Sequence, residues 1–303
     1  MIHALYNYFL TRESKKVNNR IHKTLRWQLF KYLKAHLETY YKTLPLKDLN
    51  IDISSELVVS LTSIPKRIHF VPLVVKSMLN QTYKPKKIVL WLGLELFPNK
   101  EADLPKALLD LKSHGLLICF REDLKPHTKY FYAFKSYPEE LIVTVDDDLF
   151  YPKDLLNRLM LTYKKYPHCV IAHRVRYIQV NKNAVLPYRN WPINPKGMRN
   201  PSHKLLATGV GGVLYKPSLF TDDLLEKTSL KKLCLNADDI WLKAHEIKDT
   251  IPVVFTHYYF RPFIEIAKSQ EQGLHNKNVF NHGNDIQITD TFSYFGISNT
   301  DLD

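Results

Sequence analysis

Short apolar runs alternate with segments of helical period along most of the chain. The runs at residues 57–61, 86–93, 115–120 and 141–145 are rich in β-branched and other apolar residues. Each is followed by a segment in which apolar residues recur every three or four positions, as on one face of a helix. Strands and helices that alternate in this way are typical of an α/β fold with a largely parallel sheet. We therefore predict an α/β domain over residues 51–303.

The pattern becomes less regular in the second half of the chain. Residues 169–180 predict one or two strands, and residues 250–260 predict another. The segment 237–247 has helical period, and Asn236 stands where it would cap that helix. Residues 181–203 form a long loop rich in Pro and Asn, and a loop of this length in a compact domain usually carries function. The residues after 260 show no clear period, so we predict no element there.

The first 50 residues form a basic amphipathic leader. They hold ten Lys or Arg against three Asp or Glu, which is more than half of the chain's net charge of +13. Apolar residues recur every four positions along this leader, at Ile21, Leu25, Leu29, Leu33, Leu37 and Tyr41. One interpretation is a helix whose apolar stripe packs on the protein's own body while its lysines face water. The other is that residues 1–45 attach to an anionic membrane surface. Nucleic-acid binding is a third reading, but no nucleic-acid motif accompanies the charge, so we expect no such partner.

The composition narrows the class of protein. With 45% hydrophobic residues, the chain can bury a large core and does not read as disordered. Cys119, Cys169 and Cys234 are odd in number and widely spaced, which predicts reduced thiols and neither a disulfide framework nor a zinc site. No apolar run is long enough to span a bilayer, and the first residues lack the apolar core of a secretory signal. We therefore expect a cytoplasmic protein.

Three consecutive acids, Asp146, Asp147 and Asp148, directly follow the apolar run 141–145. In an open α/β sheet, ligands bind beyond the carboxyl ends of the strands, where these acids would lie. Carboxylate oxygens suit hard divalent cations such as Mg²⁺ or Mn²⁺, and a bound cation would relieve the repulsion among three negative charges. The alternative is that the acids are solvated turn residues ahead of a helix that begins near Pro152.

Three motifs follow one another in a fixed order. The apolar strand with its D-x-D triplet comes first, then "GVGGVLY" at residues 209–215 and "NADDIWLK" at residues 236–243. In this order they resemble nucleotide-sugar-dependent glycosyltransferases of the GT-A fold, particularly bacterial enzymes that build surface polysaccharide. The resemblance covers residues 56–290 and leaves the leader outside. It implies a Rossmann-like mixed sheet flanked by helices.

The resemblance also implies roles for individual acids. Asp146 would face the nucleoside and, with Asp148, hold the Mn²⁺ or Mg²⁺ that bridges the diphosphate, and Asp147 would add a less defined donor contact. Thr62 and Arg67 match the segment that lines the nucleotide pocket in such enzymes.

Further donor contacts follow from the resemblance and from the chemistry of the leaving group. Lys129 would add a second positive charge beside the diphosphate, unless it is a solvated surface residue. The segment with Gly209, Gly211 and Gly212 would lie beneath the donor sugar, because glycine lets the backbone approach a ligand closely. The alternative for these glycines is a bulged strand.

The acids in "NADDIWLK" resemble the acidic pair that precedes the catalytic helix in this fold. Asp239 would be the general base for the acceptor hydroxyl, and Asp238 would bind acceptor hydroxyls. Both also stand in a first helical turn, where acids are favoured for structural reasons. His257 is the candidate third metal ligand, with His275 and His282 as rivals.

The resulting hypothesis is a metal-dependent hexosyltransferase. It would move a single sugar, with inversion, from a UDP-sugar to a lipopolysaccharide, capsule, lipid-linked or other glycan acceptor. A single transfer is expected because the Gln-x-x-Arg-Trp signature of processive synthases is absent. Two alternatives remain. One is a metal-dependent phosphohydrolase, although Phe150 occupies the fifth place of its D-x-D-x-Thr/Val motif. The other is a non-catalytic protein that binds a membrane or nucleic acid through its basic leader.

Overall fold

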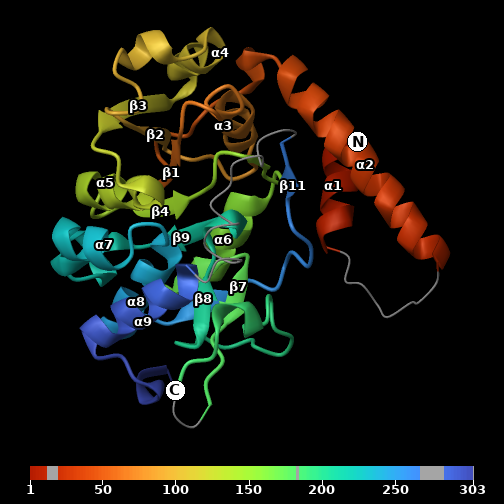
Figure 1. The fold of residues 1–303 in the computed structure, drawn as a ribbon. Helices are drawn as coiled ribbons and strands as arrows, with labels where there is room; N and C mark the ends of the chain where they lie inside the picture. Colours follow the sequence, from red (N-terminus) through yellow and green to blue (C-terminus); the bar gives the residue numbers. More distant parts are fainter. Residues whose placement is uncertain (12–19, 182–183, 267–282, 303) are drawn as a thin grey trace.

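The computed structural model of the chain describes residues 1–11, 20–181, 184–266 and 283–302 (Figure 1). Its centre is a sheet of seven strands in the order β10-β6-β9-β4-β1-β2-β3. The strands are β1 Leu57–Ser63, β2 Lys87–Gly93, β3 Leu116–Arg121, β4 Leu141–Thr144, β6 Val170–Ala172, β9 Val213–Tyr215 and β10 Val253–Phe255. β9 runs antiparallel to its neighbours β4 and β6, and the other neighbouring strands are parallel. The predicted mixed α/β sheet is confirmed.

Two short ribbons flank the main sheet. β5 Leu149–Phe150 pairs with β11 Ile264–Glu265, and β7 Val175–Tyr177 pairs with β8 Leu205–Ala207. The helices of the domain are α3 Val71–Leu79, α4 Lys106–Leu109, α5 Thr128–Ser136, α6 Leu155–Lys165, α7 Lys227–Leu233, α8 Asp238–Lys248 and α9 Gly283–Phe295. The periodic segments of the sequence thus became the predicted strand-helix units.

Both faces of the sheet are covered by helices. Val58 and Val59 are adjacent in β1, yet they belong to different hydrophobic clusters, because successive strand residues point to opposite faces. The cluster around Val59 includes residues of α3 and α6, and the cluster around Val58 includes residues of α5 and α8. Burial on both faces explains why these strands read as nearly continuous apolar runs.

The leader forms two helices, α1 Ile2–Thr11 and α2 Arg20–Thr43, which lie side by side along one side of the domain (Figure 1). Leu33, Leu37 and Tyr41 of α2 are fully buried in the same core cluster as β1 and α3. Leu25 and Trp27 are each 56% exposed. The apolar stripe therefore divides: its C-terminal half packs on the domain, and Leu25 faces solvent.

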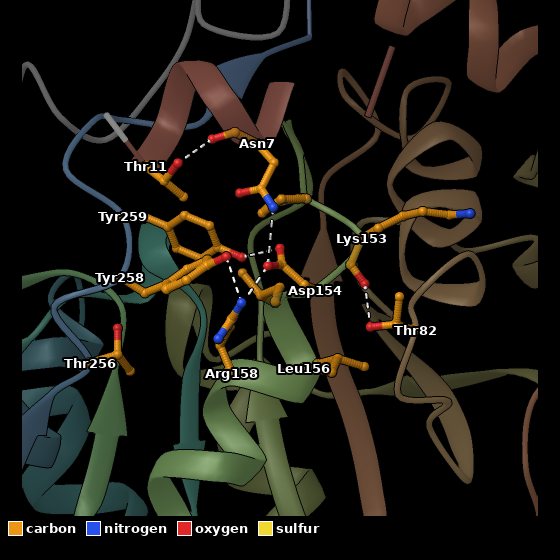
Figure 2. Close-up of polar contacts among 12 residues, drawn as sticks. Asn7, Thr11, Thr82, Lys153, Asp154, Leu156, Arg158, Thr256, Tyr258 and Tyr259 are labelled. Carbon is orange, nitrogen blue, oxygen red and sulfur yellow. Dashed lines mark hydrogen bonds and ion pairs between the residues drawn. The ribbon is translucent and has the colours of Figure 1, made fainter. Parts of the chain in front are cut away.

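Hydrogen bonds tie α1 to the segment that follows the three aspartates. The buried hydroxyl of Tyr6 donates to the carbonyl of Phe150 at 2.6 Å and accepts from the amide of Ile264 at 2.9 Å. Figure 2 shows a second junction, at Asp154, whose carboxylate accepts from Asn7 Nδ2 at 3.3 Å and from the Tyr259 hydroxyl at 2.7 Å. The leader thus contacts both β5 and the chain that leads to β11.

Several local predictions need correction. Asn236 does not cap α8, since Ala237 occupies the N-cap position and no side chain caps the helix. The segment of helical period after the run at residues 86–93 does not form one helix, since the 3-10 turns Lys100–Asp103 and Asp110–His114 flank the short α4. α9 was not predicted, because its stability comes from packing against α8 and α7 more than from its own pattern. Within the described ranges, none of the helices combines the length and apolarity that a bilayer crossing requires.

Candidate active site

A buried lysine joins acids from two distant parts of the chain. The ammonium group of Lys129, on α5, lies 2.9 Å from Asp146 Oδ1 and 3.0 Å from Asp238 Oδ2. Asp146 follows β4 and Asp238 begins α8, so the lysine links the end of the central strand to the start of that helix. The Ser60 hydroxyl donates to the Lys129 carbonyl at 2.5 Å and anchors α5 on β1. Lys129 is thus shared by two carboxylates of the protein itself, and its contact with a donor diphosphate stays a prediction.

Asp238 and Asp239 have opposite electrostatic environments. Burial alone would raise the pKa of Asp238, but the charge of Lys129 outweighs it and holds that pKa below its usual value. The pKa of Asp239 is raised well above its usual value by burial and then by the negative charge of Asp238. The Asp239 side chain accepts a hydrogen bond from the amide of Gly209 at 3.1 Å. A half-buried carboxyl group with a raised pKa has the properties of a general base.

Gly209 is the glycine that touches this cluster. A Cβ atom added to it would lie 2.7 Å from Lys129 Nζ and 3.5 Å from an oxygen of both Asp146 and Asp239. Of the three glycines named from the sequence, Gly211 and Gly212 have different neighbours. A Cβ on Gly211 would collide with the backbone of Arg174, at 2.8 Å from its nitrogen. Gly212 has a φ of +77°, and a Cβ atom added to it would lie 3.4 Å from the Leu155 side chain.

Asp147 and Asp148 face a single guanidinium group. Arg67 Nη2 lies 3.0 Å from Asp147 Oδ1, and Arg67 Nη1 lies 3.2 Å from Asp148 Oδ2. The Ser63 hydroxyl donates to Asp147 at 2.5 Å, and the Asp147 side chain is only 3% exposed. Asp147 therefore holds the segment after β4 against the end of β1 and against Arg67. Arg67, predicted in the nucleotide pocket, is engaged by the acids themselves.

Asp146 and Asp148 each face one cation of the protein, Lys129 and Arg67 respectively, and their carboxylates are the candidate ligands of a metal ion. Burial raises the pKa of Asp148 to about 7, and the charges of Asp146 and Asp147 add to this effect. The side chain of Asp146 is 28% exposed. Divalent Mg²⁺ or Mn²⁺ is commonly held by one or two carboxylates together with substrate phosphates. The two carboxylates fit such an ion, because a cation would relieve the repulsion that raises the pKa of Asp148.

His257 lies elsewhere. Its Nε2 contacts the carbonyl of Met198, and its ring packs against Phe255 in a tilted arrangement with 4.2 Å between centroids. Across the described residues, no three His, Cys, Asp or Glu side chains are grouped so as to hold a metal. The structure thus argues against His257 as a third ligand. Its rivals, His275 and His282, lie outside the described residues.

Thr62 stands at the end of β1, as expected, but its hydroxyl donates to the carbonyl of Trp91 on β2 at 2.8 Å. Two site residues escaped the sequence analysis. The buried Tyr151 hydroxyl accepts a hydrogen bond from the amide of Asp146 at 2.8 Å and so orients the first acid. Arg174 donates to the Thr208 hydroxyl at 3.0 Å, and the negative charges of Asp239 and Asp146 act on it. Neither residue belongs to a sequence motif that could have revealed it.

A separate groove of about 660 Å³ lies between the loop at residues 184–187 and the C-terminal helices. It contains none of the predicted site residues. Its lining consists of Ala184, Val185, Leu186, Pro187, Asp285, Ile288, Thr289, Phe292, Ser293, Ile297, Ser298, Asn299 and Thr300.

Known structures resemble this fold at low sequence identity. A mannosyltransferase from Pyrobaculum calidifontis, PcManGT, solved in complex with GDP-Man and Mn²⁺, superposes with a TM-score of 0.50 and 12% identity, over 99% of this chain and 77% of its own. S. aureus TarS 1-349 in complex with UDP gives 0.38 and 14%, over 68% and 59% of the two chains. A 4-diphosphocytidyl-2C-methyl-D-erythritol synthase gives 0.42 and 10%, over 69% and 93%. The first likeness establishes the fold, and the other two are too distant to support an argument.

A search of curated protein sequences found no match. The family model for glycosyl transferase family 2 matches residues 66–223, more than half of the chain. The matched region includes Lys129, Asp146, Asp148 and Gly209, and the acidic pair at residues 238–239 lies just beyond it. With this match and a GT-A-like mixed sheet, the protein belongs to glycosyl transferase family 2.

Proposed function

We propose that the protein transfers one hexose from a nucleoside-diphosphate sugar, with UDP as the carrier, to a glycan or lipid-linked acceptor. The observation that carries the proposal is the convergence of Asp146, Lys129, Asp238 and Asp239 around Gly209. These residues come from α5, the end of β4, the link before β9 and the start of α8. Family membership supports sugar transfer over the phosphohydrolase alternative.

Asp239 is the proposed general base. It removes the proton of an acceptor hydroxyl as that oxygen forms a bond to the anomeric carbon, and the bond from this carbon to the diphosphate oxygen breaks. Attack from the side opposite the leaving group inverts the anomeric centre. Lys129 holds Asp238 ionised, and the charge of Asp238 raises the pKa of Asp239. A base with a raised pKa accepts a proton more readily near neutral pH.

Asp146 and Asp148 are the proposed ligands of Mn²⁺ or Mg²⁺, together with oxygens of the donor diphosphate. When bound, such an ion supplies Lewis-acid stabilisation of the charge on the leaving group. Tyr151 orients Asp146 through the Asp146 amide, and Arg67 steadies Asp148. The Mn²⁺ in the PcManGT complex is in keeping with this proposal.

A panel of UDP- and GDP-sugars, assayed for nucleoside-diphosphate release with Mn²⁺, with Mg²⁺ and with a chelator, tests the proposal. We expect release with one donor, raised by an acceptor glycan and lost in chelator. Replacing Asp239 with Asn should lower turnover by about a hundredfold or more while donor affinity stays within about twofold. Asp222→Asn, at an exposed acid ahead of α7, is the matched control. Normal turnover of the Asp239 variant would refute the assignment of Asp239 as the general base. Full activity in chelator would refute the dependence on a metal ion.

We also propose that the exposed part of α2 attaches the enzyme to the cytoplasmic face of an anionic membrane, where it would add sugar to lipopolysaccharide or capsule precursors. Leu25, Trp27 and Tyr32 are 56%, 56% and 37% exposed, and Lys31 Nζ lies 3.6 Å from the centre of the Trp27 ring. Apolar side chains beside lysines are the pattern of interfacial helices.

Sedimentation with vesicles tests this attachment. The protein should sediment with vesicles that contain phosphatidylserine more than with phosphatidylcholine vesicles. The double variant Leu25→Ser, Trp27→Ser should lose most of this binding, and Ile53→Ser, at a residue 80% exposed outside the leader, should keep it. Equal sedimentation with both kinds of vesicle would dismiss the membrane role.

A further inference from the structure

Arg174 and Arg176 stand beside the candidate active site, and neither forms an ion pair with an acid among the described residues. Arg174 Nη1 donates to the Thr208 hydroxyl at 3.0 Å. Arg176 Nη1 donates to the Trp191 carbonyl at 3.0 Å, and its guanidinium lies 4.5 Å from the centre of the Tyr188 ring. Within the described ranges of the chain, neither arginine forms an ion pair with Asp or Glu.

The Arg176 side chain is removed from bulk water, and Arg174 is half-buried. Arg176 is only 8% exposed, and its buried Nε has no hydrogen-bond acceptor among the described residues. Burial lowers the pKa of Arg174, and the negative charges of Asp239 and Asp146 act in the opposite direction. A buried cation that no carboxylate contacts directly is costly. Such a cost is typically tolerated where a ligand supplies the missing negative charge.

The two arginines lie on the side of β4 opposite to β1, the strand that leads to Arg67 and the predicted nucleotide pocket. Arg174 follows β6, whereas β1, β2 and β3 lie on the other side of β4. Thr208, which holds Arg174, directly precedes Gly209, whose amide holds Asp239. The guanidinium and the proposed base therefore flank the same turn, so a group bound by Arg174 lies beside Asp239, where the reacting sugars would meet.

We infer that Arg174, with the charge of Arg176 behind it, binds an anionic group on a sugar at the transfer centre. The inference rests on the proposed sugar transfer and adds the substrate class. A guanidinium presents paired donors that match a carboxylate or a phosphate. Arg174 is half-buried and so remains reachable, while Tyr188 packs beside Arg176. The anion belongs either to the sugar transferred, as in a uronic acid, or to the acceptor, as in a sugar phosphate.

Binding to matched ligand pairs separates these two sources. The donor pair is UDP-glucose and UDP-glucuronate, which differ at C6 by a hydroxymethyl against a carboxylate. The acceptor pair is glucose and glucose 6-phosphate, titrated into protein saturated with UDP and Mn²⁺. We expect the anionic member of one pair to bind about tenfold tighter or more. Preference within the donor pair assigns the anion to the donor, and preference within the acceptor pair assigns it to the acceptor.

Variants then test whether Arg174 creates the preference. Arg174→Met should reduce it to within about twofold, and Arg174→Lys should restore only part of it, because lysine lacks the paired donors. Arg189→Met removes an exposed charge near Tyr188 and should keep the preference. If the wild type shows no preference in either pair, or if Arg174→Met weakens neutral and anionic ligands equally, the inference is wrong. The second result would make Arg174 a positioning residue for Asp239, with a shifted pH profile for a neutral donor. Failure of UDP and every UDP-sugar to bind would overturn the proposed function itself.

Discussion

Replacing Asp148 with Asn should stabilise the metal-free protein at pH 8. The Asp148 side chain is 11% exposed and lies beside two other acids. Burial and the charges of Asp146 and Asp147 raise its pKa from 3.8 to about 7, even with Arg67 3.2 Å away. The folded protein therefore resists ionisation of this carboxyl group, whereas the unfolded chain does not.

The size and sign of the effect follow from proton linkage. Because the folded-state pKa is raised, the stability that Asp148 contributes is fully present below about pH 4 and is lost as the pH rises through about 7. Ionising the group in the folded state then costs on the order of 4 kcal/mol. Asn cannot ionise, but it also loses the charged contact with Arg67. We expect a net gain of about 2 to 4 kcal/mol in the free energy of unfolding at pH 8, and little gain at pH 5.

Urea unfolding followed by circular dichroism, in chelator at pH 5 and pH 8, measures these differences. Asp110→Asn, at an exposed i,i+4 pair with Lys106, should change stability by less than about 0.5 kcal/mol at either pH. Adding Mn²⁺ at pH 8 should stabilise the wild type and leave Asp148→Asn unaffected. An Asp148 variant destabilised equally at both pH values would refute the electrostatic reasoning, and equal stabilisation of both proteins by Mn²⁺ would refute the metal assignment.

Three further substitutions address the contacts around the site. Lys129→Met leaves Asp146 and Asp238 without their shared cation, so the free energy of unfolding in urea should fall by about 3 to 5 kcal/mol. An unchanged unfolding midpoint would mean that Lys129 does not stabilise the fold through these two acids. Gly209→Ala places a Cβ 2.7 Å from Lys129 Nζ, so turnover should fall at least about tenfold while the far-UV circular dichroism spectrum is retained. Full activity would show that the backbone at Gly209 can shift to make room for the methyl group. Tyr6→Phe strands two buried backbone groups and should cost about 1 to 3 kcal/mol, whereas a neutral effect would mean that α1 is not held through this hydroxyl.

Much of the fold could be predicted because its strands and helices have local patterns. The apolar runs became β1 to β4, and the segment after Asn236 became α8. The order of the motifs also predicted that Asp146, Asp238 and Asp239 would share one site, since acids at strand ends and helix starts meet at the same edge of an α/β sheet. α9 was missed because its stability depends on contacts with α8 and α7.

The partners of the site residues were beyond prediction. The sequence assigned Lys129 and Arg67 to the donor, but the folded chain pairs both with the protein's own acids. It also proposed His257 for the metal, and the fold turns that ring toward Met198. Each pair joins residues far apart in sequence, so its distance depends on the order of strands in the sheet.

By itself, the sequence determined the strand-helix units, the acids at the end of one strand and the concentration of positive charge in the leader. These features depend on periodicity and composition over a few neighbouring residues. The tertiary structure decided which acids are neutralised, which keep a raised pKa, and which half of the leader stripe is buried. The physical reason is that the cost of a charge or an apolar side chain depends on what surrounds it. Packing of distant segments sets those surroundings, and it brings Arg174 to the turn that holds Asp239.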